Sequence, residues 1–204
     1  MVKPHLESFG WPIFIGSLEG PWARAPAVND AARKATESVP DWEIAFIADC
    51  DTLTDPDGIH RAVQWVRSTK GGVRPHEQRY MLDHTQTIQA VQRGPETLPR
   101  EKLRAPYAGG GLDIVHREAW DAVGGMNEEY VGWGWEDSDF HVRLILHASW
   151  ERLPGVAYHL HHQSTDPVPN RESRNRFAQF QREHRKELDE WAKTKGLRQP
   201  MAVL

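Results

Sequence analysis

A run of apolar residues that stops at two acids constrains the fold of this chain more than any other feature. Residues 44–48 read Ile-Ala-Phe-Ile-Ala, and Asp49 and Asp51 follow with one residue between them. An uninterrupted apolar run of this length is typical of a strand buried on both faces, as in a parallel sheet. Ligands of open α/β sheets bind just beyond the carboxyl ends of such strands. Two carboxylates there suit a divalent cation that carries a phosphate, although a solvated Asp-rich turn is the structural alternative.

Length, charge and cysteine content narrow the class of protein. The 204 residues fit one domain, and a net charge of -4 gives no long-range attraction to nucleic acid. Cys50 is the only cysteine, so no intrachain disulfide is possible, and we interpret it as a small packing residue. No segment approaches the ~18 apolar residues of a membrane span, and the first residues lack the apolar core of a signal peptide. A cytoplasmic location is the expectation.

Apolar periodicity predicts strands and helices in alternation. Strands are expected at residues 11–16, 44–49 and 156–162, an edge strand at 71–75, and helices at 24–36, 55–68, 84–92, 117–123, 137–147 and within 170–195. A mobile loop is expected at 93–106 because it holds three prolines and several charges. Two strand–helix units in succession predict a doubly wound α/β sheet flanked by helices.

A second group of candidate site residues lies where the predicted helix at 137–147 begins. The sequence Gly-Trp-Gly-Trp over residues 132–135 precedes Glu136 and Asp137. Glycines let the backbone approach a ligand, and indole rings such as that of Trp133 offer flat faces. Acids in the first turn of a helix are stabilised in their ionised form by the helix dipole. An ionised carboxylate beside a sugar hydroxyl can act as a general base; the structural alternative is ordinary capping acids.

Histidines form the third group, near the end of the predicted strand at 156–162. Neutral imidazole is a common ligand of transition metals. His159 and His161 share a face if the strand is regular, whereas His159 and His162 converge only if the chain bends between them. Surface histidines at a strand end are the alternative.

These three groups, in this order, resemble the motifs of the GT-A glycosyltransferases. The likeness is greatest to the β1,4-galactosyltransferases and the related polypeptide N-acetylgalactosaminyltransferase-type and family 2 enzymes, and it covers roughly residues 11–165. Asp49-Cys50-Asp51 is similar to the Asp-x-Asp that holds Mn²⁺ and the sugar nucleotide in that family. Residues 133–137 are similar to its Trp-Gly-x-Glu-Asp acceptor motif, and His159–His162 contain its late metal-binding histidine.

A further likeness lies in residues 22–29, which resemble the family's Phe-Asn-Arg-Ala-x-x-x-Asn segment. It places Arg24 on the nucleotide diphosphate and Asn29 in the same donor site. The family begins with a strand and loop that carry part of the nucleoside pocket, and none of the ten residues before Trp11 looks like that strand. We therefore predict a single GT-A-like domain over 1–204 that lacks the usual first strand, with its core at about 11–165 and a C-terminal helical tail at about 169–195. Recognition of the base is left open.

The resemblance implies a role for each candidate residue. The enzyme would transfer a sugar from a nucleotide-sugar, most simply a UDP-sugar, to a hydroxyl acceptor such as a carbohydrate. The expected metal ligands are Asp51, His159 and His162, and mixed oxygen and nitrogen ligation suits Mn²⁺ better than Mg²⁺. The expected donor contacts are Arg24, Asn29, Asp49, Gly110 and Gly111, with Asp49 on the ribose or on a metal-bound water. Asp137 would accept the acceptor's proton, Glu136 would hold its other hydroxyls, and Trp133 would form a wall of the site.

Three other functions remain open on the sequence. The absent first strand would fit a non-catalytic GT-A-like domain that binds a nucleotide-sugar or a carbohydrate. A retaining transferase of the same fold is a second possibility, because Asp-x-Asp occurs in retaining and inverting enzymes. A metal-dependent hydrolase is the third, but it would leave the Trp-Gly-x-Glu-Asp block without a role.

Overall fold

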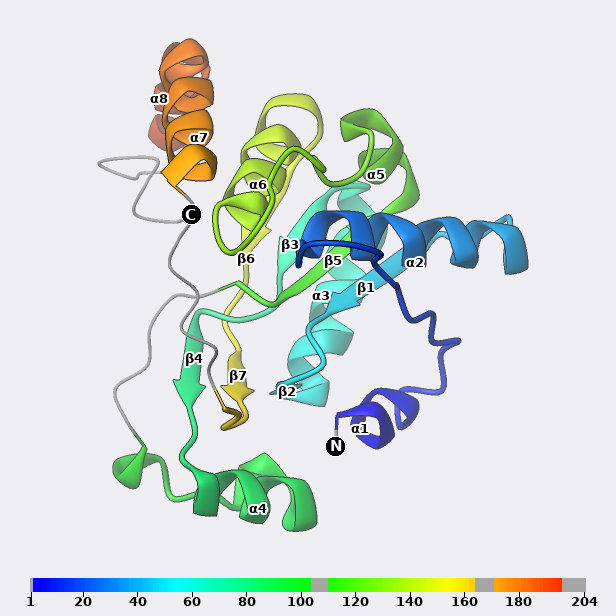
Figure 1. Ribbon diagram of the computed structural model, residues 1–204, viewed down its shortest axis with the longest axis vertical. Helices are drawn as coiled ribbons and strands as arrows, with labels where there is room; N and C mark the ends of the chain where they lie inside the picture. Colours follow the sequence, from blue (N-terminus) through cyan, green and yellow to red (C-terminus); the bar gives the residue numbers. More distant parts are fainter. Residues whose placement is uncertain (1, 104–109, 164–170, 196–204) are drawn as a thin grey trace.

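The computed structural model describes residues 2–103, 110–163 and 171–195. Two small mixed sheets follow one another along the long axis of the molecule, with the C-terminal helices at one end and helix α4 (His84–Arg93) at the other (Figure 1). None of the helices in the described part of the chain is long and apolar enough to cross a membrane.

The first sheet has four strands in the order β1-β5-β3-β6. Their bounds are β1 Ile44–Ala48, β3 Gly72–Arg74, β5 Leu112–His116 and β6 Trp150–Arg152. β5 pairs antiparallel with both β1 and β3, and β3 pairs parallel with β6. The apolar run at 44–48 is therefore an edge strand with one antiparallel partner, and its side chains are only partly buried. The expectation that it lies inside a parallel sheet is wrong, because β5 is the single partner of β1 in this sheet and the two strands pair antiparallel.

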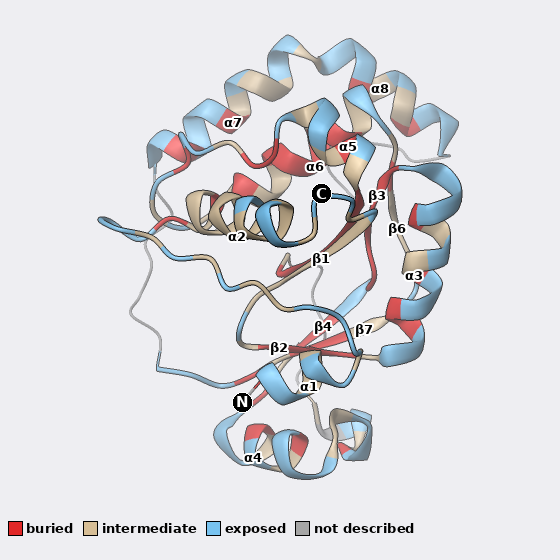
Figure 2. Cartoon of the chain, turned by 90° about the vertical axis from the view of Figure 1, so that its right-hand side faces the viewer, coloured by how far each residue is buried: buried red, intermediate tan, exposed pale blue. Residues whose placement is uncertain are grey.

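Helices cover the two faces of this sheet separately, as the alternation of apolar side chains along the strands requires. Three helices pack on one face, where Ala45 and Val115 point: α2 (Arg24–Ser38), α5 (Arg117–Val123) and α6 (Glu136–His147). Helix α3 (Pro56–Thr69) packs on the other face against Phe46 and Ile114. Figure 2 shows the buried residues concentrated in the strands and in the inward sides of these helices.

Helix α3 illustrates how local sequence sets an element. Asp55 accepts a hydrogen bond from the Asp57 backbone at its start, and Pro56 occupies the first helical position. Ile59, Ala62 and Val66 form a fully buried stripe, at the spacing expected of an amphipathic helix. The predicted helix at 55–68 is confirmed.

The second sheet has three strands in the order β2-β7-β4. They are β2 Thr52–Thr54, β4 Gln78–Met81 and β7 Val156–His159; β7 pairs antiparallel with β2 and parallel with β4. Leu53, Tyr80 and Tyr158 form its core together with Ala90 of α4. The remaining elements at this end are the short helix α1 (Lys3–Glu7) and the 3₁₀ turns η1 (Pro95–Thr97) and η2 (Arg100–Lys102).

The chain crosses between the two sheets at residues 49–51, directly after β1 and before β2. This crossing places Asp49 and Asp51 at the junction of the sheets. The side chain of Cys50 is exposed there, so the interpretation of Cys50 as a packing residue is wrong.

The C-terminal segment forms two helices, α7 (Arg171–Glu183) and α8 (Arg185–Thr194), where one had been predicted. Phe177 and Leu188 anchor them on α6 through Val142, and the ring of Trp135 stacks on Phe177 with 5.5 Å between centroids. The chain breaks at His184, and each half buries its own apolar residue against α6.

Other details of the sequence-based prediction need correction. Residues 11–16 form no strand, since they run as an irregular segment across the surface, with Trp11 and Ile15 exposed. β3 is a central strand and not an edge strand. The segment expected to be a loop at 93–106 contains η1 and η2, and its last three residues lie outside the described residues.

Candidate functional site

Asp51, His159 and His162 form a cluster that could hold a metal ion. One potential ligand atom from each residue lies within 4.8 Å of the others. The Asp51 Oδ2 atom is 3.4 Å from Nε2 of His159 and 3.3 Å from Nε2 of His162. Burial alone would raise the pKa of Asp51, but His159 and a hydrogen bond from Thr52 lower it to about 2. One carboxylate and two imidazoles are a donor set that suits Mn²⁺ or Zn²⁺.

A bend after β7 decides which histidines come together. The strand ends at His159, and the Leu160 amide then donates to the Asp51 carbonyl over 2.8 Å. His162 consequently returns toward His159, with 5.1 Å between the ring centroids. His161 lies elsewhere, because its amide binds the Thr87 hydroxyl over 2.7 Å and its ring meets that of His84. Of the two alternatives left by the sequence, the structure has the His159–His162 pair.

A buried arginine links the acids of two separate motifs. Arg24, the first residue of α2, donates from Nε to Asp49 Oδ1 over 2.7 Å and from Nη1 to Asp137 Oδ1. Its side chain is only 10% exposed. Burial lowers the pKa of Arg24, but Asp137 and Asp49 outweigh that effect and leave the pKa above its ordinary value. The fold therefore brings together the start of α2, the end of β1 and the start of α6.

Two β-like segments fix the start of α2 against the loop before α6. Ala23 forms a parallel bridge with Gly132, and the Gly132 amide donates to the Trp22 carbonyl over 2.9 Å. Trp135, the residue before α6, has a φ of 79°. A non-glycine residue in this left-handed region is strained. The ring of Trp135 stacks on Phe177 in this conformation.

The two adjacent acids at the start of α6 have pKa values that are shifted in opposite directions. Glu136 is 6% exposed, and burial together with the Asp137 charge raises its pKa to about 7. Burial also acts to raise the pKa of Asp137, but Arg24 reverses this, and the pKa lies below its ordinary value. Environments that separate the pKa values of neighbouring acids are typical of acid and base pairs in active sites. Glu136 Oε2 is buried without a hydrogen-bond partner among the described residues.

Gly110 and Gly111 leave space for the two acids. A Cβ atom at Gly110 would collide with the Asp137 carboxylate, and one at Gly111 would lie 2.9 Å from Asp49 Oδ2. Gly111 also has a φ of +103°, which other residues rarely adopt. These glycines thus admit the acids, and the predicted contact with a donor sugar stays a prediction; Gly109 of the same run lies outside the described residues.

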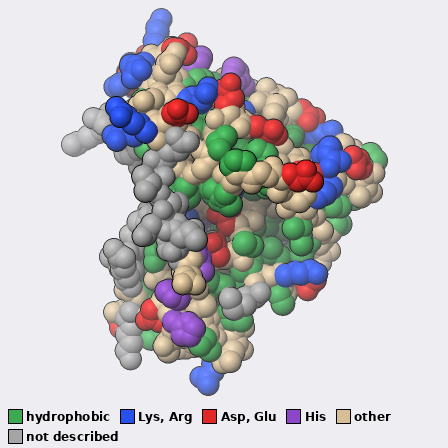
Figure 3. Space-filling model, in the orientation of Figure 1, with side chains coloured by type: hydrophobic (Ala, Val, Ile, Leu, Met, Phe, Trp, Pro, Cys, Tyr) green, Lys and Arg blue, Asp and Glu red, His purple; other side chains and the backbone are tan. Residues whose placement is uncertain are grey.

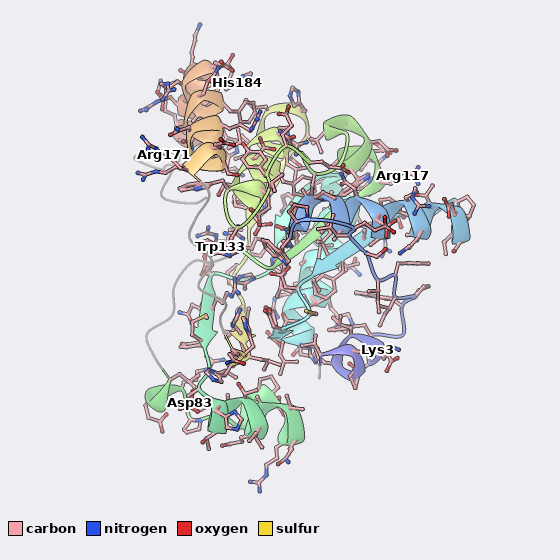
Figure 4. All side chains as sticks on the ribbon, in the orientation of Figure 1. Lys3, Asp83, Arg117, Trp133, Arg171 and His184 are labelled. Carbon is pink, nitrogen blue, oxygen red and sulfur yellow. The ribbon has the colours of Figure 1, made fainter. Side chains whose placement is uncertain are left out.

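Trp133 lies on the loop before α6, near the middle of the long axis of the molecule (Figure 4). It is 48% exposed, and Trp22 and Val131 are exposed nearby on the paired segments. In Figure 3, acidic side chains show inside a hollow at the middle of the same face, with hydrophobic side chains above them and histidines below. The predicted role of Trp133 as a wall of the site fits this position.

Asn29 is engaged away from the acids. Its amide nitrogen donates to the Met126 carbonyl (2.9 Å) and to Glu128 (2.8 Å), and its oxygen accepts from the Met126 amide (2.9 Å). These bonds tie α2 to the loop after α5. The structure thus gives Asn29 a role in holding this loop and does not bring it into the group formed by Arg24, Asp49 and Asp137.

Sequence reasoning missed Arg79. Its Nη1 donates to the Gly110 carbonyl over 2.7 Å, and its charge lowers the pKa values of both Asp51 and Asp137. Arg79 belongs to β4, which has no distinctive motif. Only the packing of β4 beside β7 reveals that a cation lies between the two groups of acids.

Comparisons with known proteins bear on the fold. Residues 97–163 match the family described as the N-terminal domain of galactosyltransferase. No curated protein sequence matches the chain. Two crystal structures of Drosophila β1,4-galactosyltransferase 7 match, each with 19% sequence identity and a TM-score of 0.54, over 86% of this chain and 70% of theirs. One is a complex of the catalytic domain with xylobiose, and the other is a mutant in complex with manganese, UDP-Gal and xylobiose.

These likenesses identify the fold. The chain has a galactosyltransferase-like GT-A fold, as the motifs predicted, and its strands form two mixed sheets flanked by helices where a single sheet was expected.

Proposed function

We propose that the chain is a metal-dependent glycosyltransferase that moves a sugar from a UDP-sugar to the hydroxyl of a carbohydrate acceptor. The observation that carries the proposal is the arrangement at the sheet junction. Asp49 and Asp51 contact different groups: Asp51 meets two histidines, and Asp49 shares Arg24 with Asp137. A candidate metal-binding group and a candidate base thus lie on either side of one short segment. The fold is that of a Drosophila galactosyltransferase that was crystallised with manganese and UDP-Gal.

Asp51, His159 and His162 would hold the cation, which we expect to be Mn²⁺ or, less suitably, Mg²⁺. Held there, a divalent cation would supply positive charge to offset the negative charge of a diphosphate leaving group. Arg24 would supply a further positive charge to the donor: its Nη2 atom is buried and has no hydrogen-bond partner among the described residues. Asp49 would contact the ribose or a metal-bound water.

Asp137 would remove the proton from the attacking acceptor hydroxyl. Its lowered pKa keeps it ionised at neutral pH, and Arg24 fixes the orientation of its carboxylate. Glu136 would hold other hydroxyls of the acceptor, while Trp133 covers one side of the sugar. Attack from the face opposite the diphosphate would invert the anomeric centre.

A screen of nucleotide-sugars tests the proposal. The chain is incubated with Mn²⁺, a panel of UDP-sugars led by UDP-galactose, and simple saccharide acceptors, and free UDP is measured. Release that depends on both Mn²⁺ and an acceptor is expected. Tight UDP-sugar binding without any release would indicate the non-catalytic binding domain, and a product that keeps the anomeric configuration of the donor would indicate a retaining enzyme.

The histidines provide a ranked prediction. Replacing His159 or His162 with alanine should weaken Mn²⁺ binding by ~10-fold or more, as expected for a lost metal ligand. His161→Ala is the matched control and should change affinity much less, because its ring contacts His84 instead. Titration of Mn²⁺ by electron paramagnetic resonance gives the affinities. A larger loss in His161→Ala than in His162→Ala would contradict the proposed ligand set.

Glu136 predicts an inflection in the pH profile. Its pKa of about 7 means that it becomes ionised as the pH rises through neutrality. An ionised carboxylate accepts hydrogen bonds from sugar hydroxyls, so kcat/KM for the acceptor should rise through an inflection near pH 7. Glu136→Gln should remove the inflection, since glutamine does not titrate. An unchanged inflection in that variant would assign it to another group.

A further inference from the structure

A buried network of charged residues lies beneath the first turns of α6. His141 of α6 bonds through Nε2 to Asp113 of β5 over 2.7 Å and through Nδ1 to Arg74 of β3 over 3.0 Å. The exposed fractions are 0% for His141 and 2% for each of the other two residues. The network thus joins a helix to two neighbouring strands of the first sheet, and none of its members was singled out by the sequence motifs.

The bonding pattern fixes the protonation of the imidazole. A guanidinium group only donates hydrogen bonds, so Nδ1 of His141 must accept from Arg74. Nε2 then carries the proton and donates to Asp113. Burial also lowers the pKa of His141, which favours this neutral form. The network is therefore a positive Arg74 and a negative Asp113 joined through an uncharged ring.

The network is closely tied to Asp137 in two ways. His141 follows Asp137 by four residues on α6, so the two side chains lie on the same side of the helix. Gly110, three residues before Asp113 on the same segment, abuts the Asp137 carboxylate. Among the described residues, Nε and Nη1 of Arg74 have no hydrogen-bond partner. The Arg74 charge is thus only partly satisfied by its own network.

We propose that Arg74 is a positioning residue for Asp137: its hydrogen bond to His141, four residues along α6 from Asp137, fixes a buried positive charge beneath the start of this helix. A positive charge there favours the carboxylate form of Asp137, and His141 in turn ties α6 to Asp113 of β5. The catalytic consequence rests on the proposed function, whereas the effect on Asp137 does not. Arg74 differs from Arg24 in that it makes no hydrogen bond to either Asp49 or Asp137, so a bound donor would leave it in place.

Several other charges face Asp137 and must be considered in a test. Burial raises the pKa of Asp137, and Arg24, His141 and Arg79 lower it alongside Arg74. Asp49 of the β1–β2 crossing and Glu136 of the same helix are the neighbouring acids. Since none of these residues is replaced in the Arg74 variants, a shift in the Asp137 titration would report the Arg74 charge.

The alternative is a purely structural role. Buried ion pairs often add little to stability as a pair, although removal of one partner is costly. In that case Arg74→Gln and Asp113→Asn would both destabilise the fold, and neither would alter the titration of Asp137 in a way that depends on the sign of the lost charge.

The test is a titration of the Asp137 side-chain carboxyl by ¹³C NMR, with the resonance assigned by its loss in Asp137→Asn. Removing the positive charge in Arg74→Gln should move the Asp137 titration to higher pH by about one unit, as expected for loss of a nearby opposite charge. Removing the negative charge in Asp113→Asn should leave it at or below the wild-type position. The double variant should fall between the single variants, because both charges are then absent.

Three controls keep the result interpretable. Arg74→Lys preserves the charge and should titrate near wild type. Arg152→Gln removes a partly buried arginine from neighbouring β6 and should leave Asp137 unchanged. Thermal unfolding of each variant reports folding; if Arg74→Gln fails to fold, Asp113→Asn and the double variant decide the sign. A titration of Asp137 that is the same in all folded variants would overturn the proposal.

Activity provides the second readout and separates the two proposals. If the enzyme transfers a sugar, its kcat/KM profile should have an acidic limb below the inflection assigned to Glu136, and this limb should move to higher pH in Arg74→Gln together with the NMR titration. If the NMR shift appears and no UDP-sugar is ever turned over, the proposed function fails while the positioning of Asp137 stands. An acidic limb that stays in place while Asp137 shifts would show that another group is the base.

Discussion

Asp137→Asn is expected to lower kcat by ~10² to 10⁴, which is the usual contribution of general base catalysis. Asparagine keeps the shape of the side chain and an oxygen that can accept from Arg24, but it cannot take up the acceptor's proton. Binding of Mn²⁺ and UDP should survive, because neither is assigned to Asp137. Steady-state kinetics together with calorimetric titration of Mn²⁺ and UDP measure the two effects separately.

The control for Asp137→Asn is Asp121→Asn, an exposed aspartate of α5 that pairs with Arg117. It should leave kcat unchanged. If Asp137→Asn turns over normally while Glu136→Gln is inactive, the two acids exchange roles. If both variants keep full activity, the inverting mechanism is wrong, and a retaining enzyme without a protein base becomes the better description.

Asp51→Asn should abolish Mn²⁺-dependent activity while leaving the fold intact. Asp51 would provide the anionic ligand of the cluster, and a neutral amide oxygen beside two imidazoles would bind a divalent cation much more weakly. Activity measured against increasing Mn²⁺ and thermal unfolding without metal are the two readouts. Removing the metal from the wild-type chain with a chelator should reproduce the loss, and added Mn²⁺ should reverse it.

Asp57→Asn is the matched control for Asp51→Asn. Asp57 lies on the exposed first turn of α3, a few residues along the same segment. It should retain the wild-type dependence on Mn²⁺. Full activity of Asp51→Asn at low Mn²⁺ concentration would place the metal elsewhere and would remove the main support for the proposed catalytic role of this junction.

Asp49 and Asp51 are two positions apart in the chain but have different surroundings in the fold. Asp49 lies beside Arg24 and the carbonyl of Gly111, which accepts from the Asp49 amide over 2.9 Å. Asp51 directly precedes β2, and its carbonyl accepts from the amide of Leu160, the residue after β7. The two acids therefore lie in different environments at the crossing between the sheets. Burial raises the pKa of Asp49, whereas His159 outweighs the effect of burial at Asp51 and lowers its pKa.

Much of the secondary structure follows from local sequence. The stripe of Ile59, Ala62 and Val66 and the cap at Asp55 define α3, because helical periodicity and capping act within a few residues. The irregular segment at 11–16 shows the limit of the same reasoning. Its apolar residues suggest a strand, but a strand needs a partner, and no neighbouring strand lies beside this segment among the described residues.

The motifs by themselves determined the class of fold, the junction acids and the acidic start of α6. Only the tertiary structure decided that Arg24 joins Asp49 and Asp137, which lie 25 and 113 positions away in the chain. It also decided that His162 and not His161 meets His159, and that the charge of Arg79 lowers the pKa values of both Asp51 and Asp137. The physical reason is range. Periodicity and capping depend on neighbours along the chain, whereas charge pairs between distant segments depend on how two sheets and their helices pack together.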